Sequence, residues 1–208
     1  DFSFFVEVCN EDAHIFFFFL NFALSYIKFI IRSKRNLKMI NPVSLIQLKA
    51  FARQDGAIVG RLLTVSFALM ILFPANALSA LMALSTPFVV AWRLKSFRDD
   101  ALEGHISFRR AFAYTVYTFF YASIIFSLVQ VIYFHFMDHG TFFNMLRTAI
   151  AQGADLYREA GLDVDGLSAS VDTFQQLGAV NVAFMFMLQN IMIGFLLALP
   201  IAAIMRKG

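Results

Sequence analysis

The chain has 208 residues, of which 60% are hydrophobic and only 15% are charged. Ordinary soluble domains carry about 25% charged residues, so this composition excludes most of that class and predicts one all-α domain, a polytopic bundle of membrane helices. The net charge of +3 does not indicate nucleic-acid binding, because the basic residues gather in a few segments, and the lone Cys9 excludes an intrachain disulfide.

The first 38 residues differ from the rest in composition. They hold nine of the 27 phenylalanines and end in a strongly basic stretch at 32–38. Residues 13–31 are long enough to form an extra N-terminal span, with its start outside the cell. The alternative, which we favour, takes Met39 as the natural start and residues 1–38 as an atypical extension or non-native leader. The domain is accordingly placed at 39–208.

Four segments of this domain are predicted to be the core transmembrane helices. The third has 26 residues without a formal charge. As a helix it would reach about 39 Å, more than a hydrocarbon core of about 30 Å. Its aromatic residues gather near both ends, where amphipathic rings favour the membrane interface. The predicted spans lie near residues 56–73, 77–92, 111–136 and 177–205.

Amphipathic segments are expected to lie on the membrane surface. Residues 40–54 place apolar side chains at helical spacing with basic residues between them. The 40-residue segment 137–176 is the most polar part of the domain and is predicted to be an outer loop. It would hold one helix at 141–160 and a second at 167–176, and Asp165 is the expected cap of the second.

Small residues in two of the spans predict close helix packing. Gly56 and Gly60 form a small-xxx-small motif at the start of the first span, which permits two helix backbones to approach within the chain or between chains. Gly194 and Ala198 form a similar seam in the last span, which Pro200 is expected to bend near its end.

The distribution of basic residues predicts how the chain is threaded. From Met39 on, nine Lys and Arg lie in the segments 40–55 and 93–110 and in the C-terminal tail, whereas 137–176 holds two against six acids. The positive-inside rule therefore places both ends of the 39–208 domain and the 93–110 loop in the cytoplasm. The 137–176 loop then faces the periplasm of a bacterial inner membrane.

The charged segment before the third span carries a short recognisable pattern. It reads Phe97-Arg98-Asp99-Asp100, then Glu103-Gly104-His105-Ile106-Ser107-Phe108, then Ala111-Phe112, and the chain ends on an apolar helix closed by Arg206 and Lys207. This pattern resembles an uncharacterised bacterial membrane family of Bacteroidetes type, domain of unknown function 4199, over about residues 54–207. The resemblance implies a four-helix inner-membrane protein and assigns no reaction and no catalytic residues. Its cytoplasmic loop motif comprises Arg98, Asp99, Gly104, Ser107 and Phe108.

Polar residues inside the predicted spans are the best pointers to function. One interpretation of them is hydrogen bonding between helices, which contributes about 0.6 kcal/mol each. The other is a small polar cavity for a solute or a lipid headgroup. The residues concerned are Gln130, Gln189, Asn190 and Thr64. No Asp, Glu or Lys is placed deep in the four spans, which argues against a proton-coupled pump.

No catalytic motif is found, and no metal site or cofactor is predicted. Glu103 and His105 lack a recognised ligand spacing, and His135, Asp138 and His139 are read as solvated or pH-sensing groups at the outer interface. The favoured function is a non-enzymatic scaffold or accessory subunit. Its partners are the lipid bilayer and either a second copy or another membrane protein, with no nucleic acid. A small oligomeric transporter or channel is the alternative, and an enzyme acting on lipids has the least support.

Overall fold

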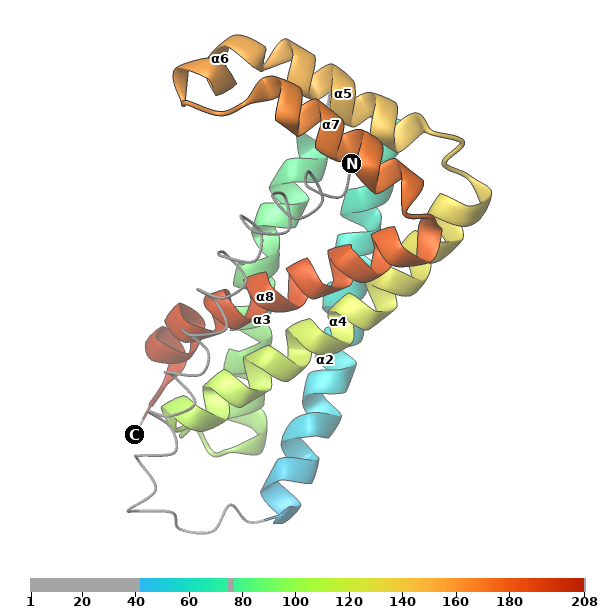
Figure 1. Cartoon of the computed structure of the whole chain (residues 1–208). Coiled ribbons are helices and arrows are strands. Elements are labelled where there is room, and N and C mark those ends of the chain that lie inside the picture. Colours follow the sequence, from blue (N-terminus) through green and yellow to red (C-terminus); the bar gives the residue numbers. More distant parts are fainter. Residues whose placement is uncertain (1–41, 75–76, 208) are drawn as a thin grey trace. The chain divides into compact units, whose positions relative to one another are not determined.

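The computed structural model describes residues 42–74 and 77–207 (Figure 1). The chain divides into two units, Asp1–Leu45 and Ile46–Gly208, and all of the contacts below lie within the second. The two interpretations of residues 1–38 therefore concern a segment outside the described residues.

The described part of the chain is all-α, as its composition predicts. Its only other regular pairing is a single β-bridge between Ile106 and Lys207. Three of its helices, α2, α4 and α8, are long and apolar enough to cross a membrane. The helices are α2 Pro42–Leu72, α3 Leu78–Ala101, α4 Phe108–Phe136, α5 Thr141–Gln152, α6 Ala154–Glu159, α7 Val164–Gln176 and α8 Ala179–Met205.

Two helices run through boundaries that the sequence patterns placed between elements. The surface helix expected at 40–54 and the span expected at 56–73 are one continuous helix, α2. The segment 93–110, expected to be a loop, is helical as far as Ala101, and only residues 102–107 connect α3 to α4. Charged residues show where a helix leaves the apolar environment, but they do not show where the helix ends. Lys and Arg are good helix formers, so the helix continues through them.

The helix boundaries predicted within 137–176 also differ from the observed ones. The single helix expected at 141–160 divides at Gly153 into α5 and α6. Helix α7 begins at Val164, earlier than the expected 167, and its N-cap is Asp163, whose carboxylate accepts a hydrogen bond from the Asp165 amide. The expectation that Asp165 is the cap was wrong, because Asp165 already lies in the first helical turn.

Helices α4 and α8 pack against each other along their length and run antiparallel (Figure 1). Gly194 of α8 lies against Phe119 of α4, and at the other end the Ser127 hydroxyl lies 3.4 Å from the Ala183 carbonyl oxygen. Several hydroxyl groups on the buried face of α4 donate to carbonyls of their own helix, which satisfies them without water. These are Thr115, Thr118 and Ser123.

Two clusters of buried apolar residues stabilise opposite ends of this pair. We call the end near the 102–107 connection the loop end, and its cluster includes Leu94, Phe97 and Ala202. The other end, where α5, α6 and α7 follow, is the cap end. Its cluster is mostly aromatic and joins the membrane helices to α5 and α7, with Phe67, Phe126, Tyr133, Phe142, Phe143, Val171 and Val182 as the buried members.

Candidate functional site

A buried ion pair joins three helices near the loop end. The Asp55 carboxylate of α2 is 1% exposed, and its Oδ1 accepts from Nε and Nη2 of Arg93 on α3 at 2.6 and 2.5 Å. Its Oδ2 accepts from the hydroxyl of Tyr114 on α4, which is fully buried. Both carboxylate oxygens therefore have partners, which is the condition under which a buried charge is tolerated.

The surroundings of this ion pair bury the acid but leave the base partly exposed. The Tyr114 ring stacks on Phe97 with the ring centres 4.8 Å apart and the planes 10° apart. Arg93, with its side chain 28% exposed, also lies over the ring of Trp92. The apolar stem of an arginine can pack against protein while its guanidinium group reaches the surface.

The position of Asp55 changes one expectation from the sequence. Asp55 lies inside the candidate span that α2 contributes, Leu45–Leu72, whereas it was placed in the surface segment before the span. It faces protein and not lipid, because Arg93 and Tyr114 surround it. An acid buried in a membrane helix is a functional pointer by default, so Asp55 joins the candidate residues.

The loop motif holds the end of α8. The Arg98 guanidinium binds the Asp99 carboxylate with two nitrogens and donates a further hydrogen bond, at 3.2 Å, to the carbonyl of Met205, the last residue of α8. It thereby satisfies one of the four carbonyls that a helix C-terminus leaves free. The hydrogen bond from Arg98 holds the pKa of the Asp99 carboxyl below its usual range, and the charges of Lys95 and Lys207 act in the same direction.

The rest of the motif binds the C-terminal tail. Ile106 and Lys207 exchange two backbone hydrogen bonds, at 2.9 and 3.1 Å. Gly104, at φ +81°, allows the turn that precedes them. Ser107 is the N-cap residue of α4 and Phe108 is its first residue. The two stretches that carry the family resemblance, far apart in sequence, are thus in contact, and the motif acts as a structural clasp.

The small residues of α2 pack within the chain. A Cβ at Gly56 would lie 2.7 Å from Cβ of Tyr121, and one at Gly60 would lie 3.1 Å from Cβ of Ile125. Both neighbours belong to α4, so this glycine pair forms a seam between α2 and α4. In α8, Ala198 is fully buried on the same side as Gly194.

The four polar residues proposed to line one cavity have separate surroundings. Thr64 and Asn190 each donate to a carbonyl of their own helix. Gln189 is exposed, whereas Gln130 is 2% exposed and its Oε1 has no hydrogen-bond partner. The register of α4 against α8 places Gln130 and Gln189 about two turns, roughly 10 Å, apart along the helix axes. The shared cavity stays a prediction.

A second buried carboxylate lies at the cap end. Asp138, in the turn between α4 and α5, is 4% exposed. Its Oδ1 accepts from the Tyr133 hydroxyl at 2.9 Å and from the Phe142 amide at 2.8 Å, and its Oδ2 accepts from the Gly140 amide at 3.2 Å. These bonds close the turn, which Gly140 enters with φ +87°.

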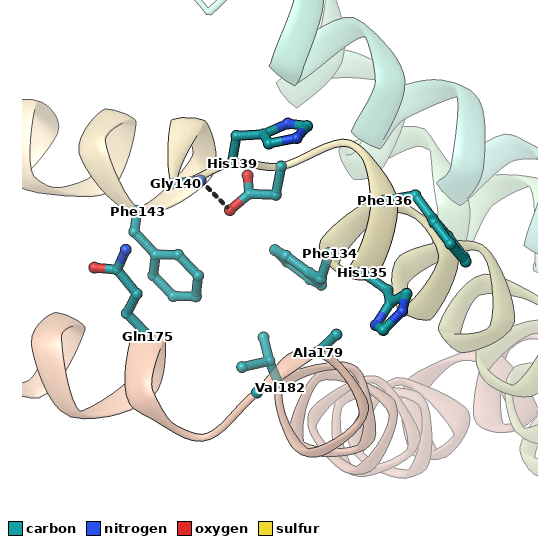
Figure 2. A pocket seen from close by; sticks show the side chains of 11 residues that line it. Phe134, His135, Phe136, His139, Gly140, Phe143, Gln175, Ala179 and Val182 are labelled. Atoms are coloured by element: carbon teal, nitrogen blue, oxygen red, sulfur yellow. Dashed lines mark hydrogen bonds between the residues drawn. The ribbon is translucent and has the colours of Figure 1, made fainter.

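A cavity of about 290 Å³ opens beside Asp138. Figure 2 shows Phe134 and Phe143 pointing into it from opposite sides, with Val182 of α8 below them. Its lining comes from the end of α4, the start of α5, the end of α7 and the start of α8, and comprises Phe134, His135, Phe136, Asp138, His139, Gly140, Phe143, Gln175, Gly178, Ala179 and Val182.

Helices α5 and α7 are joined by a polar network that reaches the cavity at Gln175. Arg147 of α5 donates to the Asp172 carboxylate of α7 at 2.5 Å and to the Gln175 side-chain oxygen at 2.5 Å. It also binds Asn144 of its own helix. The network and the aromatic cluster beneath it hold the two helices in a fixed arrangement.

The family of proteins of unknown function DUF4199 matches residues 54–207. The chain belongs to this family. No curated protein and no solved structure matches the chain. The DUF4199 match begins one residue before Asp55 and ends at Lys207, so it contains both carboxylate sites, the cavity and the clasp.

Neither carboxylate site of this DUF4199 protein was identified as a unit from the sequence. Asp55, Arg93 and Tyr114 are 38 and 21 residues apart in sequence and belong to three helices. Only the faces on which these helices meet bring them together. Asp55 directly precedes Gly56, where close packing was expected, but neighbouring residues of a helix point roughly 100° apart. Their adjacency therefore did not show where Asp55 points.

Proposed function

We propose that the protein is a multi-pass protein of a bacterial inner membrane that acts as a non-enzymatic scaffold or accessory subunit. In this proposal four helices cross the bilayer, both ends of the 39–208 domain lie in the cytoplasm, and α5–α7 form a periplasmic cap. The distribution of basic residues supports this orientation, since the 93–110 segment carries five of them.

The exposed side of α3 supports the fourth span. Leu78 to Trp92 contains no charge and would extend about 22 Å as a helix, which is short for a bilayer. Its outward side chains are nevertheless large and apolar, with Phe88 75% exposed. A large exposed apolar surface is unfavourable in water, and contact with lipid would bury it. The stripe comprises Leu81, Leu84, Phe88 and Trp92.

The ordered cap is the observation that carries the scaffold role. Helices α5 and α7 are joined by Arg147 and by the aromatic cluster, while Leu156 of α6 and Leu162, between α6 and α7, are exposed. A cap with exposed apolar side chains suits contact with a partner outside the bilayer. The partner is a second copy of this chain or another membrane protein.

Site-specific photo-crosslinking in living cells tests this role. We expect a photoreactive amino acid at Leu156 to give a discrete adduct with a partner or with a second copy, and the same group at Phe88 to give no protein adduct, because Phe88 faces lipid. Adducts would be identified by mass spectrometry after purification. Absence of a discrete adduct from Leu156, Leu162 and Glu159 would contradict the scaffold role.

A further inference from the structure

The carboxylate of Asp138 is buried without an opposite charge. Asp55, the other buried acid, is paired with Arg93, but in the described part of the chain Asp138 binds only a hydroxyl and backbone amides. A buried charge in proteins is normally paired with another charge or with a metal. A carboxylate offers about four acceptor positions. Three of those on Asp138 are filled, and Oδ2 accepts only one bond, the longest of the three.

The same carboxylate lines the cavity at the cap end. The space of about 290 Å³ is close to the lower end of the range, about 300–1,000 Å³, that small-molecule sites occupy. Phe134 and Phe143 point into it (Figure 2), and their ring centres lie 6.0 Å apart with the planes 35° apart. A cation would therefore lie beside this pair, over the face of one ring, and not between the two rings. Aromatic faces attract cations, above all organic ammonium groups, when they lie within about 6 Å.

The charges around the cavity also favour a cation. Arg147 and Arg158 are the only basic residues other than histidine in 137–176, and each is paired with an acid of the cap. Glu159, Asp163 and Asp165 are left without such a pair in the described residues, so the potential of the cap is negative.

A metal ion fits this site less well than an organic cation. In the described ranges no group of three or more His, Cys, Asp or Glu side chains is arranged to hold a metal. His139 places its Nδ1 3.1 Å from the Met137 carbonyl oxygen, and the His135 ring lies against Phe136. Figure 2 shows the His139 ring turned away from Phe134 and Phe143.

We propose that this cavity binds a small organic ammonium group, with Asp138 as its counter-ion and Phe134 and Phe143 as its aromatic walls. The cation supplies the charge that Asp138 lacks, and an N–H of a primary ammonium fits the free position on Oδ2. The group has two possible sources, a free amine and the headgroup of a lipid in the outer leaflet. The site does not depend on the scaffold role.

Calorimetric titration of the full chain in nanodiscs of phosphatidylglycerol, which has no amine, tests the proposal. Ethanolamine and choline are the probes, and sodium chloride and glycerol at the same concentrations are the controls. We expect saturable binding of at least one probe and none of glycerol. If neither ethanolamine nor choline binds saturably, the proposal is overturned, whatever the cross-linking of Leu156 shows.

Three variants test the assignment of residues. Asp138→Asn should weaken binding of the probe at least tenfold, and Phe143→Leu should weaken it several-fold while leaving the Asp138 turn intact. Asp165→Asn removes the same charge from the cap outside the cavity and should change binding less than twofold. If a folded Asp138→Asn or Phe143→Leu protein binds as the unmodified chain does, the proposal fails.

The source of the ammonium group is tested with lipids. Native mass spectrometry of the protein from discs containing phosphatidylethanolamine should retain that lipid in the unmodified chain and lose it in Asp138→Asn if a headgroup is the ligand. Retention of no lipid, together with ethanolamine binding, identifies a free amine. Equal retention by both proteins would contradict the role of Asp138 toward a headgroup.

Discussion

Replacing Asp55 with alanine is expected to lower the free energy of unfolding by about 3–5 kcal/mol, the cost of removing one partner from a buried ion pair. The change leaves the Arg93 guanidinium and the Tyr114 hydroxyl without their shared acceptor between α2, α3 and α4. Reversible unfolding by titration of SDS into mixed micelles measures this loss, and the fraction of helix follows the transition.

Two comparisons separate this effect from the loss of any acid. Asp99→Ala removes the carboxylate of an exposed ion pair and should cost less than about 1 kcal/mol. The double variant Asp55→Ala with Arg93→Met removes both charges. Its loss of unfolding free energy should be smaller than the sum of the losses of the two single variants, because neither charge is left unpaired. An Asp55→Ala loss no larger than that of Asp99→Ala would show that the buried pair does not hold the three helices.

Substituting alanine for Gly194 is expected to destabilise the protein by about 1–3 kcal/mol, although alanine is the better helix former. The added Cβ would lie 2.5 Å from Cγ of Phe119 and closer still to its Cβ, so α4 and α8 would have to move apart. Interior side chains are too closely packed to absorb such a shift without cost. The same SDS titration measures it.

A matched change on the outer side of α8 provides the control. Ala203 is exposed, and Ala203→Leu adds more volume than Gly194→Ala without meeting another helix. It should leave the unfolding midpoint within experimental scatter. If Gly194→Ala is as stable as the unmodified protein, the close approach of α4 and α8 at this position is not part of the folded state.

The candidate spans in α4 and α8 were predictable because hydropathy alone dictates them. A run from 111 to 136 without a formal charge has one stable state in lipid, a helix, and the structure extends it only to Phe108. The ends of α2 and α3 were not predictable in the same way. At Asp55 and at Arg93–Ala101 the side chains change from apolar to charged, but the backbone keeps its helical hydrogen bonds.

The candidate sites required information that periodicity does not contain. Gly56 and Gly194 indicated that helices approach closely, but not that both pack on α4. Asp138 was recognised as a residue of the outer interface, whereas its burial depends on how α5 folds back over the end of α4. The loop motif was recognised by resemblance, and its contact with Lys207 became evident only from the fold.

The central claim is that the loop end and the cap lie on opposite sides of a membrane. The most direct test uses two single-cysteine variants, Lys95→Cys and Asp155→Cys, each with Cys9 changed to serine, and a membrane-impermeant maleimide added to intact cells. The account predicts labelling of Asp155→Cys in intact cells and of Lys95→Cys only after the inner membrane is permeabilised. Equal labelling of the two positions in intact cells would contradict it.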